Sequence, residues 1–175
     1  ILFVDGFDRA LKIPDKGYPG MSLQKTESEK AIRGSNEGFG DSIKQNTALI
    51  RKRLRSVDLK VAECKCGRRT GTNVDIMYLD GIVRSEIVTQ MQQRLAAFEI
   101  DGIGDSGVIE QLTETQWFSP FPQYQTTRRP DRAVMALLEG RAVLLADNSP
   151  EVLIFPTDYN SFIKTTDDYY TRWEI

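Results

Sequence analysis

The stretch from Ala142 to Phe155 has the sequence AVLLADNSPEVLIF and is decisive for the class of fold. Two continuous apolar runs, 142–146 and 152–155, lie on either side of the turn-forming residues 147–150. A strand buried on one face alternates apolar and polar residues, whereas a strand buried on both faces is apolar throughout. The stretch therefore predicts a β-hairpin that is buried on both faces or nearly so.

An amphipathic helix is predicted in the first half, directly after a loop rich in Gly and Asn. The stretch from Arg33 to Leu54 reads RGSNEGFGDSIKQNTALIRKRL. Apolar residues recur near helical spacing at positions 43, 49, 50 and 54, and Thr47 completes the stripe, so we expect a helix over about 40–54. Asp41 suits the positive N-terminal end of the helix dipole, and the basic run 51–53 suits the negative end.

The remaining elements follow from alternation, helical spacing and turn residues. Alternating residues predict two paired strands, around 57–61 and 74–78, on either side of a basic turn at 67–71. Asp80 is expected to cap a second helix whose core face consists of Val83, Ile87, Met91, Leu95 and Phe98. The other expected elements are a hairpin at 1–13, a short helix at 107–114, a strand at 123–127, a helix from Pro130 to Gly140, and helical pieces over 157–175.

These elements indicate an α/β (α+β) protein with two small lobes, residues 1–99 and 100–175, each a mixed sheet with helices. The lobes would be joined near residue 100 by the Gly-rich segment 99–107, which has the sequence EIDGIGDSG and is called the joint below. Its G-x-G-x-x-G spacing matches a dinucleotide-binding motif, but that motif needs a preceding strand and here a helix precedes it. We interpret the joint as a flexible connection between the lobes.

Composition excludes several classes of function. The chain of 175 residues has a net charge of −2, which gives no basic field to attract nucleic acid. It contains no histidine, which removes the Ser-His-Asp and Cys-His arrangements and the commonest metal ligand. The cysteines Cys64 and Cys66 are too few for a structural zinc site and are expected to be ordinary thiols. We therefore expect no enzyme activity, no cofactor and no metal.

The ends of the chain suggest that it is part of a longer protein. It opens inside the strand-like Ile1–Val4 and stops abruptly at Ile175. It contains no apolar run of the roughly 20 residues that a membrane-spanning helix needs. We expect a piece cut from a longer chain.

Candidate site residues gather in the Gly-rich loop and the helix that follows it. Arg33 and Glu37 flank the loop and either pair across it or meet a small zwitterionic ligand, since Arg binds carboxylates through two parallel hydrogen bonds. Phe39 lies in the same loop. Asn46 is expected to bond to the backbone of the neighbouring loop rather than to a ligand. Arg51 belongs to a basic cluster that either binds anionic lipid or phosphate or is simply a solvated helix end.

A second group of candidates lies around the helix that begins at Pro130. Arg129 and Asp131 flank its first residue, and Arg141 follows the glycine that ends it. Arg141 enters a buried strand, so we expect it to pair with a carboxylate such as Glu139 or Asp131.

Short motifs spread over nearly the whole chain resemble those of one known family, and they occur in the same order. They are Arg33-Gly34, Glu37-Gly38-Phe39, NTALIR (46–51), Tyr78-Leu79-Asp80, Pro120-Phe121-Pro122, Arg129-Pro130-Asp131, LLEGR (137–141) and Asp168-Tyr169-Tyr170. The set is similar to the signature of the A subunit of germinant receptors from spore-forming bacteria. Ser35 stands where that family usually has Pro, and Asp147-Asn148 where it commonly has Asp-Gly; both are local turn changes.

The resemblance implies a soluble domain that precedes several transmembrane helices, beyond residue 175, in the inner membrane of the spore. Its partners would be an integral-membrane B subunit and a lipoprotein C subunit. Such a complex senses nutrients such as amino acids, sugars or nucleosides and starts the release of ions and dipicolinate.

Three hypotheses for function follow. In the first, a non-enzymatic signalling domain senses a small nutrient by hinge motion of its lobes and passes the change to membrane helices. In the second, the domain binds no nutrient and serves receptor assembly, for instance by self-association. In the third, carboxylates among Glu27, Glu29, Glu37 and Asp41 act as a hydrolase pair, although no spacing here is diagnostic.

Overall fold

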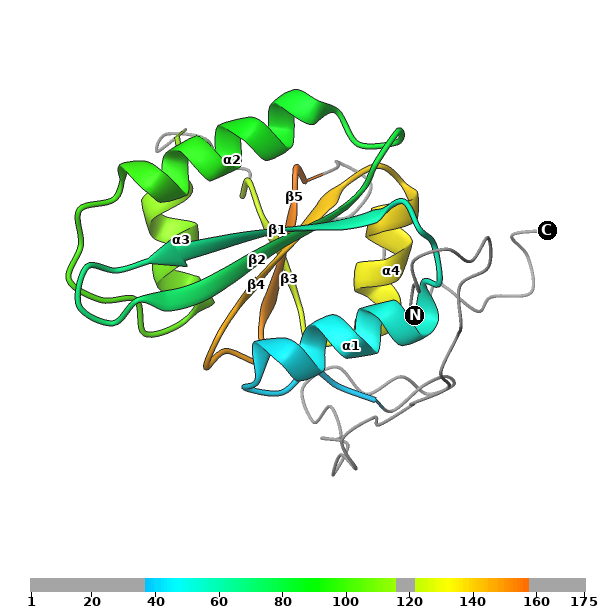
Figure 1. The fold of residues 1–175 in the computed structure, drawn as a ribbon, viewed down its shortest axis with the longest axis horizontal. Coiled ribbons are helices and arrows are strands. Elements are labelled where there is room, and N and C mark those ends of the chain that lie inside the picture. Colours follow the sequence, from blue (N-terminus) through cyan, green and yellow to red (C-terminus); the bar gives the residue numbers. More distant parts are fainter. Residues whose placement is uncertain (1–36, 116–121, 158–175) are drawn as a thin grey trace, which may run out of the picture.

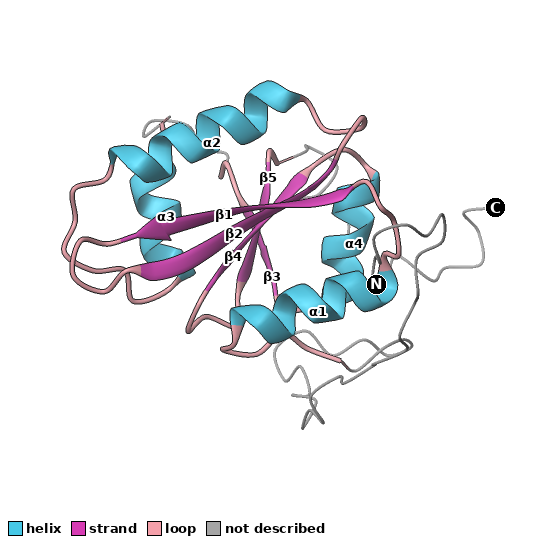
Figure 2. Ribbon diagram, viewed as in Figure 1, coloured by secondary structure: helices cyan, strands magenta, loops and turns pink. Residues whose placement is uncertain are grey.

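The computed structural model describes residues 37–115 and 122–157, which form one antiparallel sheet with helices on both faces (Figure 1 and Figure 2). The elements in chain order are α1 (Ile43–Arg53), β1 (Leu59–Cys66), β2 (Thr72–Leu79), α2 (Ser85–Ala97), α3 (Ser106–Thr113), β3 (Gln125–Thr127), α4 (Pro130–Leu138), β4 (Ala142–Ala146) and β5 (Val152–Phe155). The expected hairpin at 1–13 and the helical pieces after residue 157 lie outside the described residues.

The strand order β1-β2-β4-β5-β3 joins the two halves of the chain in one sheet. Strand β2, from the first half, pairs with β4, from the second, in the register Val74 to Ala146 and Met77 to Val143. The α/β class is confirmed, but the two lobes with separate mixed sheets are not what the described residues show. All their strand pairs are antiparallel. The division of the whole chain near residue 100 stays a prediction.

The buried hairpin predicted from residues 142–155 is confirmed and explains the layering. All residues of β4 and β5 are buried, and successive side chains point to opposite faces. Val143 and Leu145 belong to a first core, whereas Leu144 and Ala146 belong to a second. The same alternation in β2 places Met77 in the first core. A continuous apolar run therefore supplies both faces of the sheet at once.

Each core is covered by its own pair of helices. On one face, α1 and α4 pack against each other and against β4, contributing Ile50 and Leu137 to the first core. On the other face, α2 and α3 contribute Met91 and Ile109 to the second core (Figure 1). The result is a sheet between two layers of helices.

Helix α1 confirms the predicted stripe, since Ile43, Leu49 and Ile50 are buried. Its start has a feature that the sequence did not predict. The first backbone N–H, that of Ile43, donates to Asp147 Oδ1 at 3.2 Å, so a carboxylate 104 residues away lies at the positive end of the helix.

Helix α2 begins later than predicted. Its N-cap is Arg84, and Asp80 lies instead in a turn where its N–H donates to the carbonyl of Asp58. The N–H groups of Ile82 and Val83 return to the carbonyl of Leu79. Because the chain turns here before it becomes helical, Asp80 is not the cap. The buried residues of the helix are Val88, Met91 and Leu95.

Helix α4 begins at Pro130 and is followed by Gly140, as predicted. Gly140 has a φ of +82°, and a Cβ atom there would lie 3.1 Å from the carbonyl oxygen of Ile82. The left-handed backbone and the close neighbour both require glycine.

The joint is fastened to the β1–β2 turn. The N–H groups of Arg68 and Arg69 donate to the carbonyls of Ile100 and Asp101 at 2.7 and 2.8 Å. Thr70 Oγ1 accepts from the N–H of Ile103, and Gly102 approaches Thr70 so closely that an added Cβ would lie 2.7 Å from its methyl group. The segment predicted to be a flexible connection is thus a bonded part of the fold.

Candidate functional site

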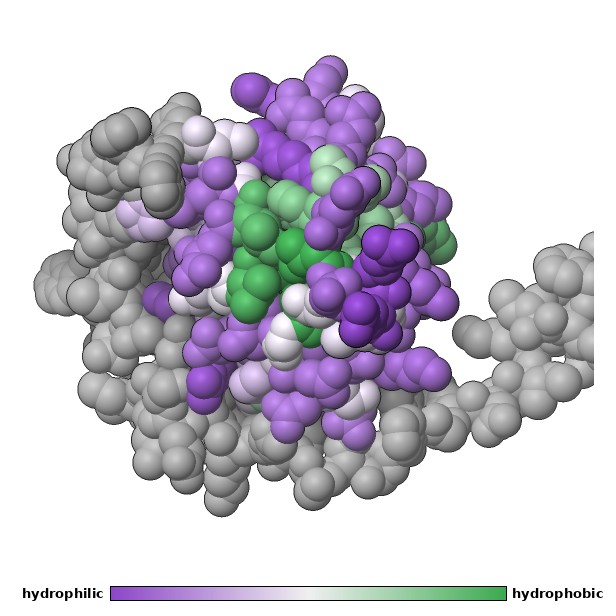
Figure 3. Space-filling view, turned by 90° about the vertical axis from the view of Figure 1, so that its left-hand side faces the viewer, coloured by the Kyte–Doolittle hydropathy of each residue, from purple (hydrophilic) through white to green (hydrophobic). Residues whose placement is uncertain are grey.

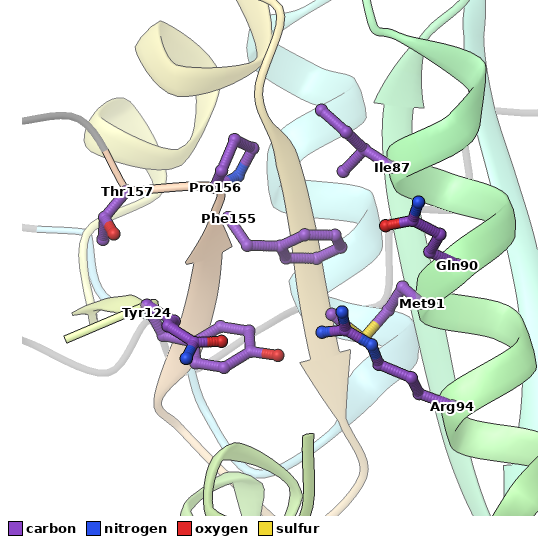
Figure 4. A pocket seen from close by; sticks show the side chains of 9 residues that line it. Ile87, Gln90, Met91, Arg94, Tyr124, Phe155, Pro156 and Thr157 are labelled. Atoms are coloured by element: carbon purple, nitrogen blue, oxygen red, sulfur yellow. The ribbon is translucent and has the colours of Figure 1, made fainter. Parts of the chain in front are cut away.

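A pocket of about 270 Å³ opens between α2 and the end of β5 (Figure 4). Its lining comes from three segments: Ile87, Gln90, Met91 and Arg94 of α2; Gln123 and Tyr124 before β3; and Phe155, Pro156 and Thr157 at the end of β5. Figure 4 shows the α2 side chains facing Tyr124 and Phe155 across the opening. The pocket therefore lies between α2 and the end of the sheet at which β5 ends and β3 begins.

Helical spacing explains the wall formed by α2. Residues 87, 90, 91 and 94 are three or four positions apart, which places them on one face of a helix. Met91 is buried in the second core and fixes the orientation of this face, whereas Gln90 is exposed and Arg94 half-buried at the rim.

Arg94 is held by polar groups rather than by a carboxylate. Its Nη1 donates to the carbonyl of Thr113 at 3.2 Å, and its guanidinium faces the Tyr124 hydroxyl (Figure 4). Among the residues that the structure describes, no carboxylate lies within 4.0 Å of it. Within the described part of the chain, no ion pair therefore neutralises its positive charge.

The amide of Gln123 is oriented by Thr115. Its Oε1 accepts from both the N–H and the Oγ1 of Thr115 at 3.2 Å. Because a backbone N–H can only donate, the amide oxygen must face Thr115, and the NH₂ group lies on the other side. Its Nε2 is buried and has no hydrogen-bond partner among the residues that the structure describes.

Two aromatic side chains form the wall opposite α2. The rings of Tyr124 and Phe155 meet edge to face, with centroids 6.1 Å apart, and both residues are buried. Burial raises the pKa of the Tyr124 hydroxyl, while hydrogen bonds with Thr113 and Arg94 act in the opposite direction. The phenol therefore stays protonated near neutral pH and serves as a hydrogen-bonding group.

The candidates predicted in the Gly-rich loop lie elsewhere, at the contact between α1 and α4. Glu37 pairs with Lys52 Nζ and Arg53 Nη2, each at 2.7 Å. Hydrogen bonding and charge from Lys52, with Arg53, hold the pKa of Glu37 below its ordinary value despite partial burial. Arg33, its predicted partner, lies outside the described residues.

Arg129 and Asp131 complete this group, which we call the α1–α4 charge cluster (Glu37, Lys52, Arg53, Arg129 and Asp131). The Arg129 side chain is only 1% exposed and binds Asp131 through two hydrogen bonds, from Nε and from Nη2. Burial acts to raise the pKa of Asp131, but the Arg129 guanidinium, with the Arg53 charge nearby, lowers it below its ordinary value. Each carboxylate of the cluster is paired with at least one cation, which fits a role in fixing α1 to α4.

Asn46 bonds to the backbone of the loop, as predicted. Its Nδ2 donates to the carbonyl of Gly40 at 2.6 Å, and its Oδ1 accepts from the N–H of Gly40 at 2.9 Å. Phe39 is buried in the first core, and its N–H donates to the carbonyl of Arg128. Both residues shape the loop from inside.

The last two candidates are separate from this cluster. Arg141 pairs with Glu139, one of its two expected partners, and also donates to Gln125 Oε1 at 3.1 Å. Arg51 is exposed, with its charge near Asp75. The structure therefore brings together Glu37, Arg129 and Asp131 and leaves Arg51 and Arg141 apart.

None of the nine residues that line the pocket was predicted as a site residue. Arg94 lies on the polar side of a helix that was predicted from its apolar residues only. Gln123 and Tyr124 were predicted to belong to a strand. The lining residues come together because α2 crosses the sheet near the end of β5. Their spacing along the chain does not predict that contact.

Metal and thiol chemistry has little structural support in the described ranges. No group of three or more Cys, Asp or Glu side chains is placed there to hold a metal ion. Cys64 and Cys66 are free thiols on the second-core face of β1, and burial raises the pKa of each. Within residues 37–115 and 122–157, no helix has the length and apolar character needed to cross a membrane.

Comparison with known proteins gives a consistent result. The family described as "Bacillus/Clostridium GerA spore germination protein" matches residues 1–175. Relatives from Bacillus subtilis include "Uncharacterized membrane protein YfkQ", 38% identical over 99% of this chain and 34% of its own, and "Spore germination protein KA", 37% identical over 100% and 32%. The chain thus spans about a third of the length of these relatives.

A solved structure supports the same assignment. The N-terminal domain of the A subunit of the Bacillus megaterium spore germinant receptor GerK3 is 39% identical. The similarity covers 70% of this chain and 97% of that one, with a TM-score of 0.56. The chain belongs to the GerA family of spore germination proteins.

Proposed function

We propose that this chain is the non-enzymatic domain of a membrane-bound nutrient germinant receptor, where it takes part in germinant sensing and in the signal that triggers spore germination. Family membership over residues 1–175 supports a germination role. The observation that carries sensing is the pocket beside α2, which combines a guanidinium, amides and a phenol with an apolar wall. Concave sites of this kind are where proteins bind small molecules.

The chemistry of the pocket favours binding over catalysis. Its lining residues contain no Asp, Glu, His, Cys or Lys, the side chains that most often transfer protons or attack substrates. Tyr124 keeps its proton near neutral pH. Arg94 and Gln123 are hydrogen-bond donors that orient a bound molecule. Both carboxylates of the α1–α4 charge cluster are held in ion pairs that lower their pKa values, so they do not form an acid–base pair.

A route for the signal lies at the pocket itself. Phe155 packs in the second core, and Thr157 Oγ1 donates to the carbonyl of Pro122 at 2.7 Å. A ligand between α2 and this segment would contact both, and would shift the equilibrium between two arrangements of the segment that leads to the C-terminal residues. We further propose that the full-length protein continues into membrane helices in the spore inner membrane and assembles there with B and C subunits.

A domain exchange tests this proposal. In spores that lack other germinant receptors, the region matching residues 1–175 is exchanged between the full-length protein and a relative with a different nutrient response. Dipicolinate release is then followed over a panel of amino acids, sugars and nucleosides. If the domain senses the nutrient, the pattern of responses should follow the exchanged region. A pattern that stays with the remainder of the receptor would contradict the sensing role.

A second candidate function is assembly without nutrient binding, and exposed apolar residues favour it. Met135 and Leu138 lie on the outward face of α4 with exposures of 43% and 48%, and Ile82, beside Gly140, is 54% exposed. Apolar side chains also gather on the face that is at the left in Figure 1 (Figure 3). Such surfaces often mark interfaces.

Sedimentation velocity of the 175-residue chain over a range of concentrations tests this alternative. Assembly predicts a concentration-dependent oligomer that Leu138→Glu disrupts, with the exposed polar residue Gln45 changed to Glu as the matched control. A monomer at every concentration would remove the support that the α4 surface gives to this alternative.

A further inference from the structure

We propose that the pocket beside α2 binds a small organic carboxylate that has an apolar body and carries no ammonium group. This inference rests on the proposed receptor function for its biological consequence and adds the chemical class of the ligand. Its physical basis lies in the charge, the hydrogen-bonding groups and the size of the pocket.

The positive charge of Arg94 favours an anionic ligand. Arg94 is half-buried at the rim, and no carboxylate among the described residues lies within 4.0 Å of its guanidinium. Its Nη1 donates to the carbonyl of Thr113, which helps to hold the group at this position. Partly buried charges are normally paired, and guanidinium binds carboxylate through parallel hydrogen bonds. An anionic ligand would supply the missing counter-ion.

The absence of acidic residues from the lining argues against a zwitterion. None of the nine lining residues is Asp or Glu, so an ammonium group of the ligand would lose water without gaining a counter-ion. Glu110 influences the pKa of Tyr124 but does not line the pocket. An amino acid would therefore bind more weakly than the same molecule without its amino group.

Gln123, in the lining of the pocket, has a second donor that lacks an acceptor among the described residues. Nε2 of Gln123 is buried and has no partner within residues 37–115 and 122–157, and the amide is oriented because Thr115 occupies its oxygen. A buried donor that lacks an acceptor destabilises the fold, because it has given up its hydrogen bonds to water. Because Nε2 has almost no accessible surface, a ligand oxygen reaches it only when the Gln123 side chain turns toward the pocket, and that bond would remove the destabilisation. This favours a molecule with acceptors over a purely apolar one.

The rest of the lining describes the body of the ligand. Ile87, Met91, Phe155 and Pro156 present carbon surface opposite the polar groups. A volume of about 270 Å³ falls just below the range of about 300–1,000 Å³ that suits drug-sized ligands. A short branched or aromatic acid fits these limits.

Three probes of nearly equal shape separate these contributions. Isovalerate is a branched carboxylate, isovaleramide is its neutral isostere, and valine is isovalerate with an added ammonium group. In ¹H–¹⁵N NMR titrations of the 175-residue chain, isovalerate should give saturable shifts at Arg94, Gln123 and Phe155. Both other probes should bind at least about tenfold more weakly.

A matched pair of variants locates the binding group. Arg94→Gln keeps a donor for the Thr113 carbonyl but removes the charge, and it should weaken isovalerate at least about tenfold. Arg68→Gln removes an exposed charge in the β1–β2 turn and should leave the affinity unchanged. The dispersion of the spectrum reports directly whether each variant is folded. If Arg94→Gln does not fold, the comparison of the three probes on the unaltered chain decides alone.

The inference is overturned if either isovaleramide or valine binds as tightly as isovalerate, if Arg94→Gln binds isovalerate as well as the unaltered chain, or if no saturable shift occurs at the pocket. These outcomes are distinct from failure of the receptor function. A domain exchange that moves the nutrient response while isovalerate fails to bind would refute the ligand class and leave the receptor role intact.

Discussion

At the scale of single residues, buried polar side chains in this fold satisfy backbone groups of the loops next to them. Asn46 is fully buried and bonds to both the N–H and the carbonyl of Gly40, so one side chain satisfies two backbone groups. The sequence placed Asn46 correctly, because an amide on the core side of a helix needs a nearby backbone partner. It gave no sign that Asp147 would cap the same helix.

Replacement of Asn46 by Ala should lower the free energy of unfolding by about 2–4 kcal/mol, since two buried backbone groups lose their partners. Urea denaturation measures the change. The control is Gln45→Ala, which alters an exposed position on the same helix and should cost less than about 0.5 kcal/mol. Equal effects of the two substitutions would show that the Gly40 contacts contribute nothing to stability.

Two carboxylates should give pH dependences of opposite sign. The pKa of Asp131 is lowered in the fold, so its contribution is present above the ordinary value of 3.8 and is lost as the pH falls through the lower folded value. Burial raises the pKa of Asp75, so the ionised carboxylate is less stable in the folded protein than in the unfolded chain. The free energy of unfolding therefore increases as the pH falls from neutral through the raised pKa. Asp131→Asn should therefore reduce the loss of stability at acid pH, whereas Asp75→Asn should remove the gain. Urea midpoints measured from neutral to acid pH would contradict this if the two variants changed the profile in the same direction.

At the scale of elements, the joint departs most from the sequence-based expectation. Its glycines suggested flexibility, yet Gly102 is needed for close approach to Thr70, and the β1–β2 turn supplies its hydrogen bonds. Glycine permits both mobility and tight packing, and the sequence alone does not distinguish them. The pocket was not predicted for a related reason. It depends on how α2 packs over the end of β5, and the sequence pattern of each element does not show how the elements pack together.

Thr70→Val should loosen the joint without unfolding the protein. Thr70 Oγ1 accepts from the N–H of Ile103, and loss of one such bond costs about 1 kcal/mol, or a roughly fivefold faster local opening. Hydrogen exchange at the Ile103 amide should rise accordingly, while exchange at Leu144, in the central strand β4, should not change. Rapid exchange at Ile103 already in the unaltered chain would instead support the flexible connection that the sequence suggested.

At the scale of the whole molecule, the predicted α/β class, the buried hairpin and the positions of α1, α3 and α4 came from periodicity and turn residues. The single sheet could not be predicted from periodicity and turn residues. Local patterns indicate strands but not their partners. The sequence therefore predicted two separate sheets, although β2 pairs with β4 across the 62 residues that lie between Leu79 and Ala142.

One sheet shared by two cores should unfold in a single step. Leu145→Ala creates a cavity in the first core and Leu144→Ala in the second, and each should cost about 2–5 kcal/mol. Both should shift one common transition, seen alike by far-ultraviolet circular dichroism and by aromatic fluorescence. Two transitions, each sensitive to only one substitution, would restore the model of two lobes.

The alternation along β4 has a consequence for how this family can change over evolutionary time. Because neighbouring residues of the strand serve opposite cores, inserting or deleting one residue there would exchange the two sets of side chains and disturb both helical layers together. Length variation among relatives should therefore collect in the loops around the strand, while β4 itself keeps a constant number of residues.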